Sequence, residues 1–212
     1  FLIVRERTGF LFGRQPPRSH LQAASWLRDK KEPVVRRMDA AAFLYEDKPG
    51  HPDTARLLPE QLQDADYGLR EHCAKLLEKI GPPAASATGA LRQTARADWH
   101  DDVRLAAISA LAVIAPDAPV TAEAAADARL DVSAPVRTIG AIAAARHGDV
   151  DAASEAADLI WLSSDGKANA HQQRQYAQRL AEATAKWTDA QVAQVRDYPP
   201  QIKAALGSFN HK

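Results

Sequence analysis

The sequence has few of the residues that build redox sites, membrane spans or large aromatic cores. Cys73 is the only cysteine, so the chain cannot form an internal disulfide, which is compatible with the cytoplasm and favours it weakly. Aromatic residues make up 6% of the chain, and no run approaches the roughly 18 apolar residues that a membrane span needs. We therefore expect an interior of thin layers of Ala, Leu, Ile and Val.

Excess charge and catalytic motifs are also missing. The formal net charge is zero and the sequence pI is about 7.2, which argues against nucleic acid as a partner. The histidines show no metal-ligand spacing, and there is no phosphate-binding Gly-rich loop and no nucleophile motif. We therefore expect no catalytic residue, cofactor or metal site. The run WHDD, Trp99 to Asp102, is the most suggestive cluster for a metal or a base, but such a run more often caps a helix.

Four arginines recur in matching contexts. Arg37, Arg70, Arg104 and Arg137 follow one another at almost equal intervals, and each opens an Ala/Leu-rich helical segment. A fixed period of this length is typical of a stacked helical repeat, in which each unit packs on its neighbours.

Proline, glycine and capping residues divide the chain into helices. We expect three regions: an extended arm over residues 1–17, repeats over 18–165 and divergent C-terminal capping helices over 166–212. The expected helices cover residues 19–29, 34–45, 54–63, 67–80, 84–96, 102–114, 121–130, 135–146, 150–162, 170–187, 188–196 and 201–206.

The repeated segment resembles the signature of HEAT repeats, in particular the short HEAT-like type also found in phycobilin lyases. It appears as DDVRLAAISALAVI over 101–114 and DVSAPVRTIGAIAA over 131–144, with leucine in place of valine in DYGLREHCAKLLEKIG over 66–81. The resemblance implies an all-α fold, a right-handed α-solenoid of about four to five helical hairpins, here with an N-terminal extended arm. It also implies that the second helix of each hairpin lies on the concave side.

In such repeats the Asp and Arg of the signature commonly bridge neighbouring units. The resemblance therefore implies a structural role for the arginines rather than a phosphate-binding stripe. The expected members of this structural ladder are Arg37, Arg70, Arg104, Arg137, Asp66, Asp102 and Asp131.

The function that this interpretation favours is a non-catalytic scaffold or accessory subunit of a larger complex. It would bind a protein partner through its concave face and its N-terminal arm, and a preformed surface limits the ordering cost of binding. Trp161 is the best anchor candidate, because tryptophan is enriched at binding hot spots. The expected partner-binding residues are Arg56, Gln63, Arg92, Arg96, Glu123, Asp127, Glu155, Asp158 and Trp161.

Three alternatives remain open at this point. The chain begins at Phe1 rather than methionine, so it can be the C-terminal region of a larger enzyme. Arg92 and Arg96 with Trp99 are faintly similar to the concave face of HEAT-like DNA glycosylases, although an acidic segment at 149–163 would repel phosphate. A bilin-lyase-type protein is the third. The arm could also be membrane-proximal, given Arg5 and Arg7.

Overall fold

The computed structural model describes residues 15–162 and 170–195, and all regular structure in these two ranges is helical. The predicted all-α helical-repeat fold is therefore confirmed. The predicted arm lies outside the described residues except for 15–17, which are not helical. The chain divides into two compact units, residues 1–115 and 116–212. No helix in the described part is long and apolar enough to cross a membrane.

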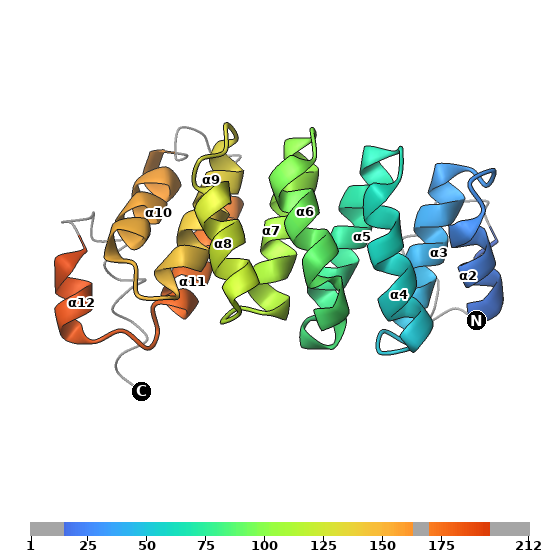
Figure 1. Cartoon of the computed structure of the whole chain (residues 1–212), viewed down its shortest axis with the longest axis horizontal. Coiled ribbons are helices and arrows are strands. Elements are labelled where there is room, and N and C mark those ends of the chain that lie inside the picture. The colour runs from blue at the N-terminus through green and yellow to red at the C-terminus, as the bar shows by residue number, and fades with distance from the viewer. Residues whose placement is uncertain (1–14, 163–169, 196–212) are drawn as a thin grey trace. The chain divides into compact units, whose positions relative to one another are not determined.

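The first unit is a stack of short helices joined by tight turns (Figure 1). The turns lie where the sequence predicts them, and the helix over 67–80 has the predicted ends. The helices are α2 (His20–Arg28), α3 (Val34–Asp47), α4 (Pro52–Glu60), the 3-10 helix η1 (Gln61–Gln63), α5 (Tyr67–Ile80), the 3-10 helix η2 (Pro82–Ala87), α6 (Thr88–Ala97) and α7 (Asp101–Ile114).

Local sequence explains where these helices begin and end. The Ser19 side chain accepts the Gln22 amide N–H, and the Asp66 side chain accepts that of Leu69, which are the usual N-terminal capping bonds. Helix α5 ends at Gly81, whose φ of 70° is easily reached only without a side chain. Pro82 follows at once and opens η2 because a helix start needs no donor there.

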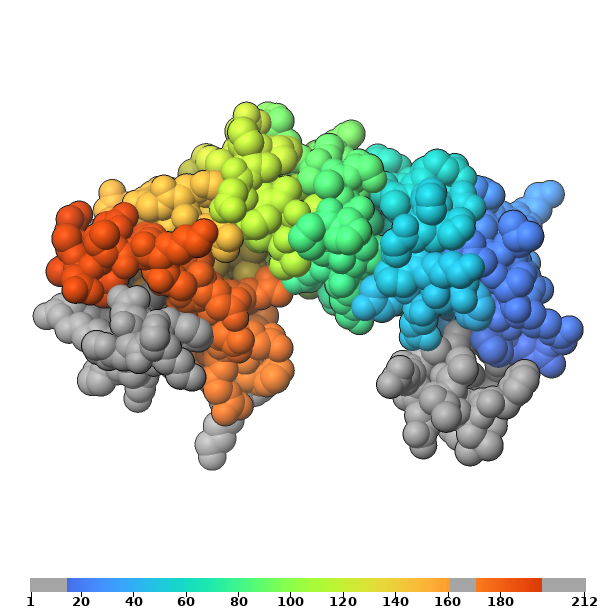
Figure 2. All heavy atoms as spheres, turned by 90° about the horizontal axis from the view of Figure 1, so that it is seen from below, coloured from blue at the N-terminus to red at the C-terminus, as the bar shows by residue number. Residues whose placement is uncertain are grey.

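Helices of the first unit form two layers. The arginine helices α3, α5 and α7 pack side by side in chain order, and α2, α4 and α6 cover this row (Figure 1). Helix α6 packs most extensively on α7, which follows it, rather than on α5, which precedes it. The closest hairpin here is thus a covering helix with the arginine helix that follows it. The space-filling view shows successive helices of this unit in close contact (Figure 2).

Leucine fills the interior of the first unit. The largest fully buried side chains of this unit, all with less than 2% exposure, are Leu27, Leu44, Leu57, Leu58, Leu62, Leu69, Leu77, Leu91, Ile108 and Leu111. Burying a leucine removes enough apolar surface from water to stabilise the fold by roughly 1.5–3 kcal/mol. These side chains pack between the two layers of the unit and stabilise their contact.

The second unit is also helical, and its interior is built mainly of alanine with a few larger side chains. Gly140 lies where α9 crosses α8, and a Cβ built there would approach the Ala128 Cβ to 2.8 Å. The two helices can therefore approach more closely than any side chain at 140 would allow. The helices are α8 (Pro119–Ala128), α9 (Ala134–Ala145), α10 (Val150–Leu162), α11 (Ala170–Ala183) and α12 (Asp189–Gln194).

Candidate interaction surface

Two repeat arginines of the first unit, Arg37 and Arg70, are buried and form ion pairs inside it. Arg37 donates through Nη2 to Asp64 Oδ2 at 2.6 Å and to Gln61 Oε1 at 2.9 Å, and through Nε to the Leu27 carbonyl. Lys30 adds a second cation to the same Asp64 carboxylate. The Arg37 and Asp64 side chains are each only 4% exposed, so this arginine is part of the interior.

Arg70 repeats the arrangement one unit further along the chain. Its Nε and Nη2 donate to the two oxygens of Asp98, at 2.7 and 2.8 Å, in a bidentate pair. Its Nη1 donates to the carbonyls of Asp64 and Ala65, at 2.8 and 3.2 Å. Arg70 therefore joins the loop before its own helix to the loop before the next arginine helix.

The contact with the preceding loop recurs in both units. In the first unit Arg104 Nη1 donates to the Asp98 carbonyl at 2.8 Å. In the second, Arg137 Nη1 donates to the carbonyls of Asp131 and Val132, at 2.8 and 3.0 Å. These bonds satisfy carbonyls in tight turns, where no helix partner exists.

The ion pairs of Arg37 and Arg70 use two carboxylates that the predicted ladder does not include. The partners of Arg37 and Arg70 are Asp64 and Asp98. Asp66 instead caps α5, and Asp102 is an exposed residue in the first turn of α7. These pairs form because the arginine side chain extends toward the following repeat and contacts an aspartate 27 or 28 residues further along the chain, as well as its own turn.

The paired carboxylates are held in their charged form. Burial alone would raise the pKa of Asp64, but hydrogen bonds from Arg37 and Lys30 and from the Asp66 amide lower it well below its usual range. Asp98 follows the same logic: burial opposes ionisation, and the bonds from Arg70 and the His100 amide outweigh it and lower the pKa. Asp64 and Asp98 are therefore ionised at neutral pH, and their carboxylate oxygens are occupied by structural hydrogen bonds.

Cys73 carries no reactive thiolate. It is fully buried in α5, and burial raises the pKa of its thiol far above the usual value. A nucleophile needs the thiolate and access to solvent. Cys73 therefore acts as a small apolar side chain in the core.

The predicted partner-binding residues of the first unit differ in their availability. Arg56 is held within α4 by Asp53 at 3.2 Å and Glu60 at 2.9 Å. Gln63 and Arg96 are exposed, whereas Arg92 is half-buried. Arg56, Gln63 and Arg96 are the exposed members of the predicted set in this unit.

The second unit separates its predicted residues in the same way. Glu123 and Asp127 on α8 and Asp158 on α10 are exposed. Glu155 accepts from Arg129 Nε at 2.7 Å, and Arg129 also donates to Asp149 at 2.9 Å. Glu155 is thus engaged in linking α10 to the turn after α8. Trp161 lies in α10, and its side chain is outside the described part of the chain.

An aromatic cluster at the surface of the first unit is the feature that the predicted partner-binding set lacks. We define the aromatic cluster as Tyr67, Trp99 and His100. The Tyr67 and His100 rings stack at 4.0 Å, and the Trp99 ring lies 4.4 Å from that of His100. Trp99 is nevertheless 77% exposed and Tyr67 46% exposed. The Trp99–Asp102 run drew attention in the sequence, but nothing there pointed to Tyr67, which belongs to the preceding repeat.

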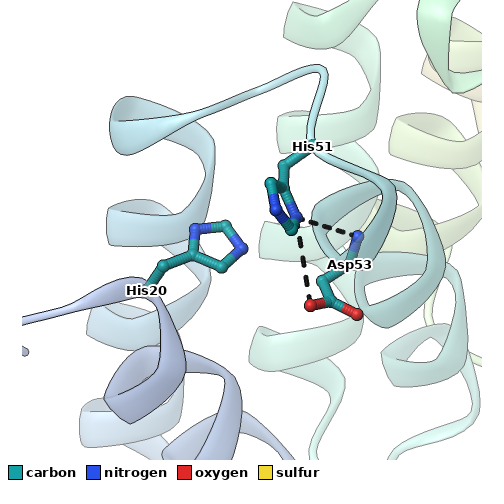
Figure 3. Close-up of side chains that lie close together, drawn as sticks. All are labelled: His20, His51 and Asp53. Carbon is teal, nitrogen blue, oxygen red and sulfur yellow. Dashed lines mark hydrogen bonds and ion pairs between the residues drawn. The ribbon is translucent and has the colours of Figure 1, made fainter.

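One group of residues in the described chain has the chemistry to hold a metal ion. It consists of His20, His51 and Asp53, whose potential ligand atoms all lie within 4.8 Å of one another. His20 is at the start of α2, and the other two are at the start of α4 (Figure 3). The two histidines are separated by the whole of α3 along the chain, so no ligand spacing in the sequence revealed them.

Comparison with known proteins identifies the repeat. Residues 21–112 match the family model for HEAT repeats, which places the match within the first unit. Searches of curated proteins and of solved structures each found no match.

Proposed function

We propose that this chain, whose residues 21–112 are HEAT repeats, is a non-catalytic scaffold or accessory subunit that binds a protein partner through exposed side chains on its loop and helix surfaces. HEAT repeats are commonly protein-interaction scaffolds. The observation that carries the proposal is the aromatic cluster, in which Tyr67, His100 and Trp99 are in contact and Tyr67 and Trp99 are exposed at the surface of the first unit.

The cluster has the properties of a binding hot spot. Tryptophan and tyrosine contribute much of the energy at protein interfaces, because they bury a large area with few rotatable bonds. The His100 ring stacks on Tyr67 and lies tilted against Trp99, so both neighbours already have an aromatic contact within the chain. Preordering lowers the entropy cost of association.

The charges near the cluster favour a cationic partner segment. Asp66 precedes Tyr67, and Asp102 lies one helical turn after Trp99 and is exposed. An arginine or lysine of a partner can stack on an aromatic face and meet a carboxylate at the same time. We therefore infer that a segment rich in Arg or Lys docks here.

A binding experiment in the native source tests the proposal. The full chain is used as bait in affinity purification with mass spectrometry, at moderate and at high salt. We expect a stoichiometric protein partner that is retained at moderate salt and weakened at high salt, since charge attraction is screened. The partner is then measured directly against the Trp99→Ala and Tyr67→Ala variants.

Leu21→Ala provides a matched control, because Leu21 is also a large exposed apolar residue, on α2 rather than in the cluster. We expect Trp99→Ala to weaken binding by about 2 kcal/mol or more, the size of a hot-spot loss, and Leu21→Ala to leave it unchanged. If no partner is recovered at either salt concentration, the scaffold proposal is overturned. A partner that binds Trp99→Ala as tightly as Leu21→Ala would overturn the role of the cluster.

A further inference from the structure

The group formed by His20, His51 and Asp53 has the donor set and support of a transition-metal site. We propose that it binds one zinc ion, which ties the start of α2 to the start of α4. Two imidazole nitrogens with one carboxylate oxygen suit zinc, and they do not suit magnesium or calcium, which prefer oxygen ligands. This inference does not rest on the proposed function.

His20 carries the strongest indication. Its Nε2 is buried and has no hydrogen-bond partner, an arrangement that costs free energy unless something binds there. Its Nδ1 lies 3.2 Å from Asp47 Oδ2, at the end of α3. A metal-bound histidine commonly gives its second nitrogen to a carboxylate, which fixes the ring and leaves the other lone pair for the metal.

His51 and Asp53 present their donor atoms to the same space. His51 Nδ1 accepts the Asp53 amide N–H at 3.1 Å, so this nitrogen is unprotonated, and it lies 3.9 Å from Asp53 Oδ2. Pro52 follows His51 and restricts its backbone to an extended conformation. The His20 and His51 ring centres are 4.2 Å apart (Figure 3). A metal bound at His51 Nδ1 replaces the capping bond at this nitrogen with coordination.

Positive charge next to the group determines which atoms remain for the metal. Arg56 Nη2 donates to Asp53 Oδ1 at 3.2 Å, which leaves Oδ2 on the side of His51. Arg28 adds a further positive field at this carboxylate. Three protein ligands leave a fourth position for water, so the proposed site is open rather than a closed structural one.

Zinc titration of the metal-free full chain, without a histidine tag, tests the proposal. We expect calorimetry with Zn²⁺ alone to show one ion per chain and the melting temperature to rise with the metal. Bound Co²⁺ should show the intense visible absorption of four-coordinate cobalt. His20→Gln and His51→Gln should abolish all three signals. Asp47→Asn should weaken affinity roughly 10–100-fold, the usual effect of losing a carboxylate behind a ligand.

The exposed His147, in the second unit, supplies the matched control, because His147→Gln removes an imidazole elsewhere. It should bind zinc like the unaltered chain. Circular dichroism confirms that each variant folds. A further variant, Arg28→Gln, adds no ligand and should tighten zinc binding, because it removes a competing cation. Two results would overturn the site: no zinc binding by the unaltered chain, or binding that persists when both His20 and His51 are replaced.

Discussion

The two units solve the same packing problem with different chemistry. The first has large leucines in its core and buries its arginine–aspartate pairs, with Arg70 and Asp98 each 6% exposed. The second packs alanine helices closely around Gly140, and its described ion pairs are nearer to water: Asp117, the partner of Arg146, is 72% exposed.

This difference teaches where stability resides in each unit. A buried ion pair costs desolvation, and removing one partner leaves an uncompensated charge, so such a site tolerates little change. A surface pair contributes little. The first unit should therefore be sensitive to loss of polar groups, and the second to added volume.

Removal of the Asp64 carboxylate should have the largest effect. Asp64→Ala leaves Arg37 buried without its anion and removes the bond to Lys30. We expect the free energy of unfolding of the first unit to fall by about 3–5 kcal/mol, measured by urea unfolding with hydrogen exchange to localise it. Asp66→Ala, which removes only a helix cap, should cost about 1 kcal/mol. Equal losses for both would contradict the comparison.

Added volume at Gly140 should come next. Ala is a better helix former than Gly by about 1 kcal/mol, but here its Cβ would lie 2.8 Å from the Ala128 Cβ and 3.0 Å from the Ala125 carbonyl oxygen. Because the contacts include backbone, we expect Gly140→Ala to destabilise the second unit by about 1–3 kcal/mol, with faster amide exchange in α8 and α9.

Gly89 in α6 is the matched control, because a Cβ there meets nothing within 4 Å. Gly89→Ala should leave the first unit as stable or stabilise it, by at most about 1 kcal/mol. If both alanine variants gained stability, the close approach at Gly140 would not limit α8–α9 packing.

Acid should weaken the first unit through its buried aspartates, with a smaller effect near neutrality. Asp64 and Asp98 have lowered pKa values in the fold, so the unfolded chain takes up protons first. Their stabilisation is present above about pH 4 and is lost as the pH falls through the folded values. Asp64→Asn should make the acid unfolding of the first unit less steep.

In the second unit Tyr176 has the opposite sign, because burial raises its pKa. Its stabilisation is present below about pH 10 and is lost as the pH rises through the folded value. Hydrogen exchange across a pH series should show alkaline opening of the second unit, which Tyr176→Phe reduces. Alkaline opening confined to the first unit would contradict this.

The smallest effect should come from Asp117. The bond from Arg146 lowers the pKa of this carboxyl, but both groups lie at the surface. We expect Asp117→Asn to leave the melting temperature of the chain unchanged within error. A loss comparable with that of Asp64→Ala would show that the second unit also depends on its ion pairs.

The repeat could be predicted from the sequence because helical periodicity and the Gly and Pro residues at helix ends are properties of short segments. The arginine spacing and Gly81-Pro82-Pro83 located α5 and its end, and Arg37 and Arg70 donate hydrogen bonds inside the first unit. Asp66 and Asp102 stand close before an arginine in the sequence, whereas the pairing of Arg37 and Arg70 depends on the stacking of successive repeats. The signal was present, since Asp64, Asp98 and Asp131 recur at nearly the same interval as the arginines.

The candidate sites were harder to predict because they depend on contacts between distant turns. Tyr67 meets His100 only after two loops stack on one edge, and His20 meets His51 only after α2 packs beside α4. Neither pair has a fixed spacing that a motif could express. Arg56 and Glu155, which also belong to the predicted partner-binding set, form ion pairs with Glu60 and Arg129.

The arginine bonds also limit which insertions and deletions the gene can accept. Three aspartates each precede a repeat arginine by six residues, because the guanidinium donates to the backbone carbonyl of that aspartate. They are Asp64, Asp98 and Asp131. The step from arginine to the next aspartate is 27 residues in one instance and 28 in another. Length variation should therefore accumulate in the longer segment, and a single added codon in the shorter one should disrupt the repeat.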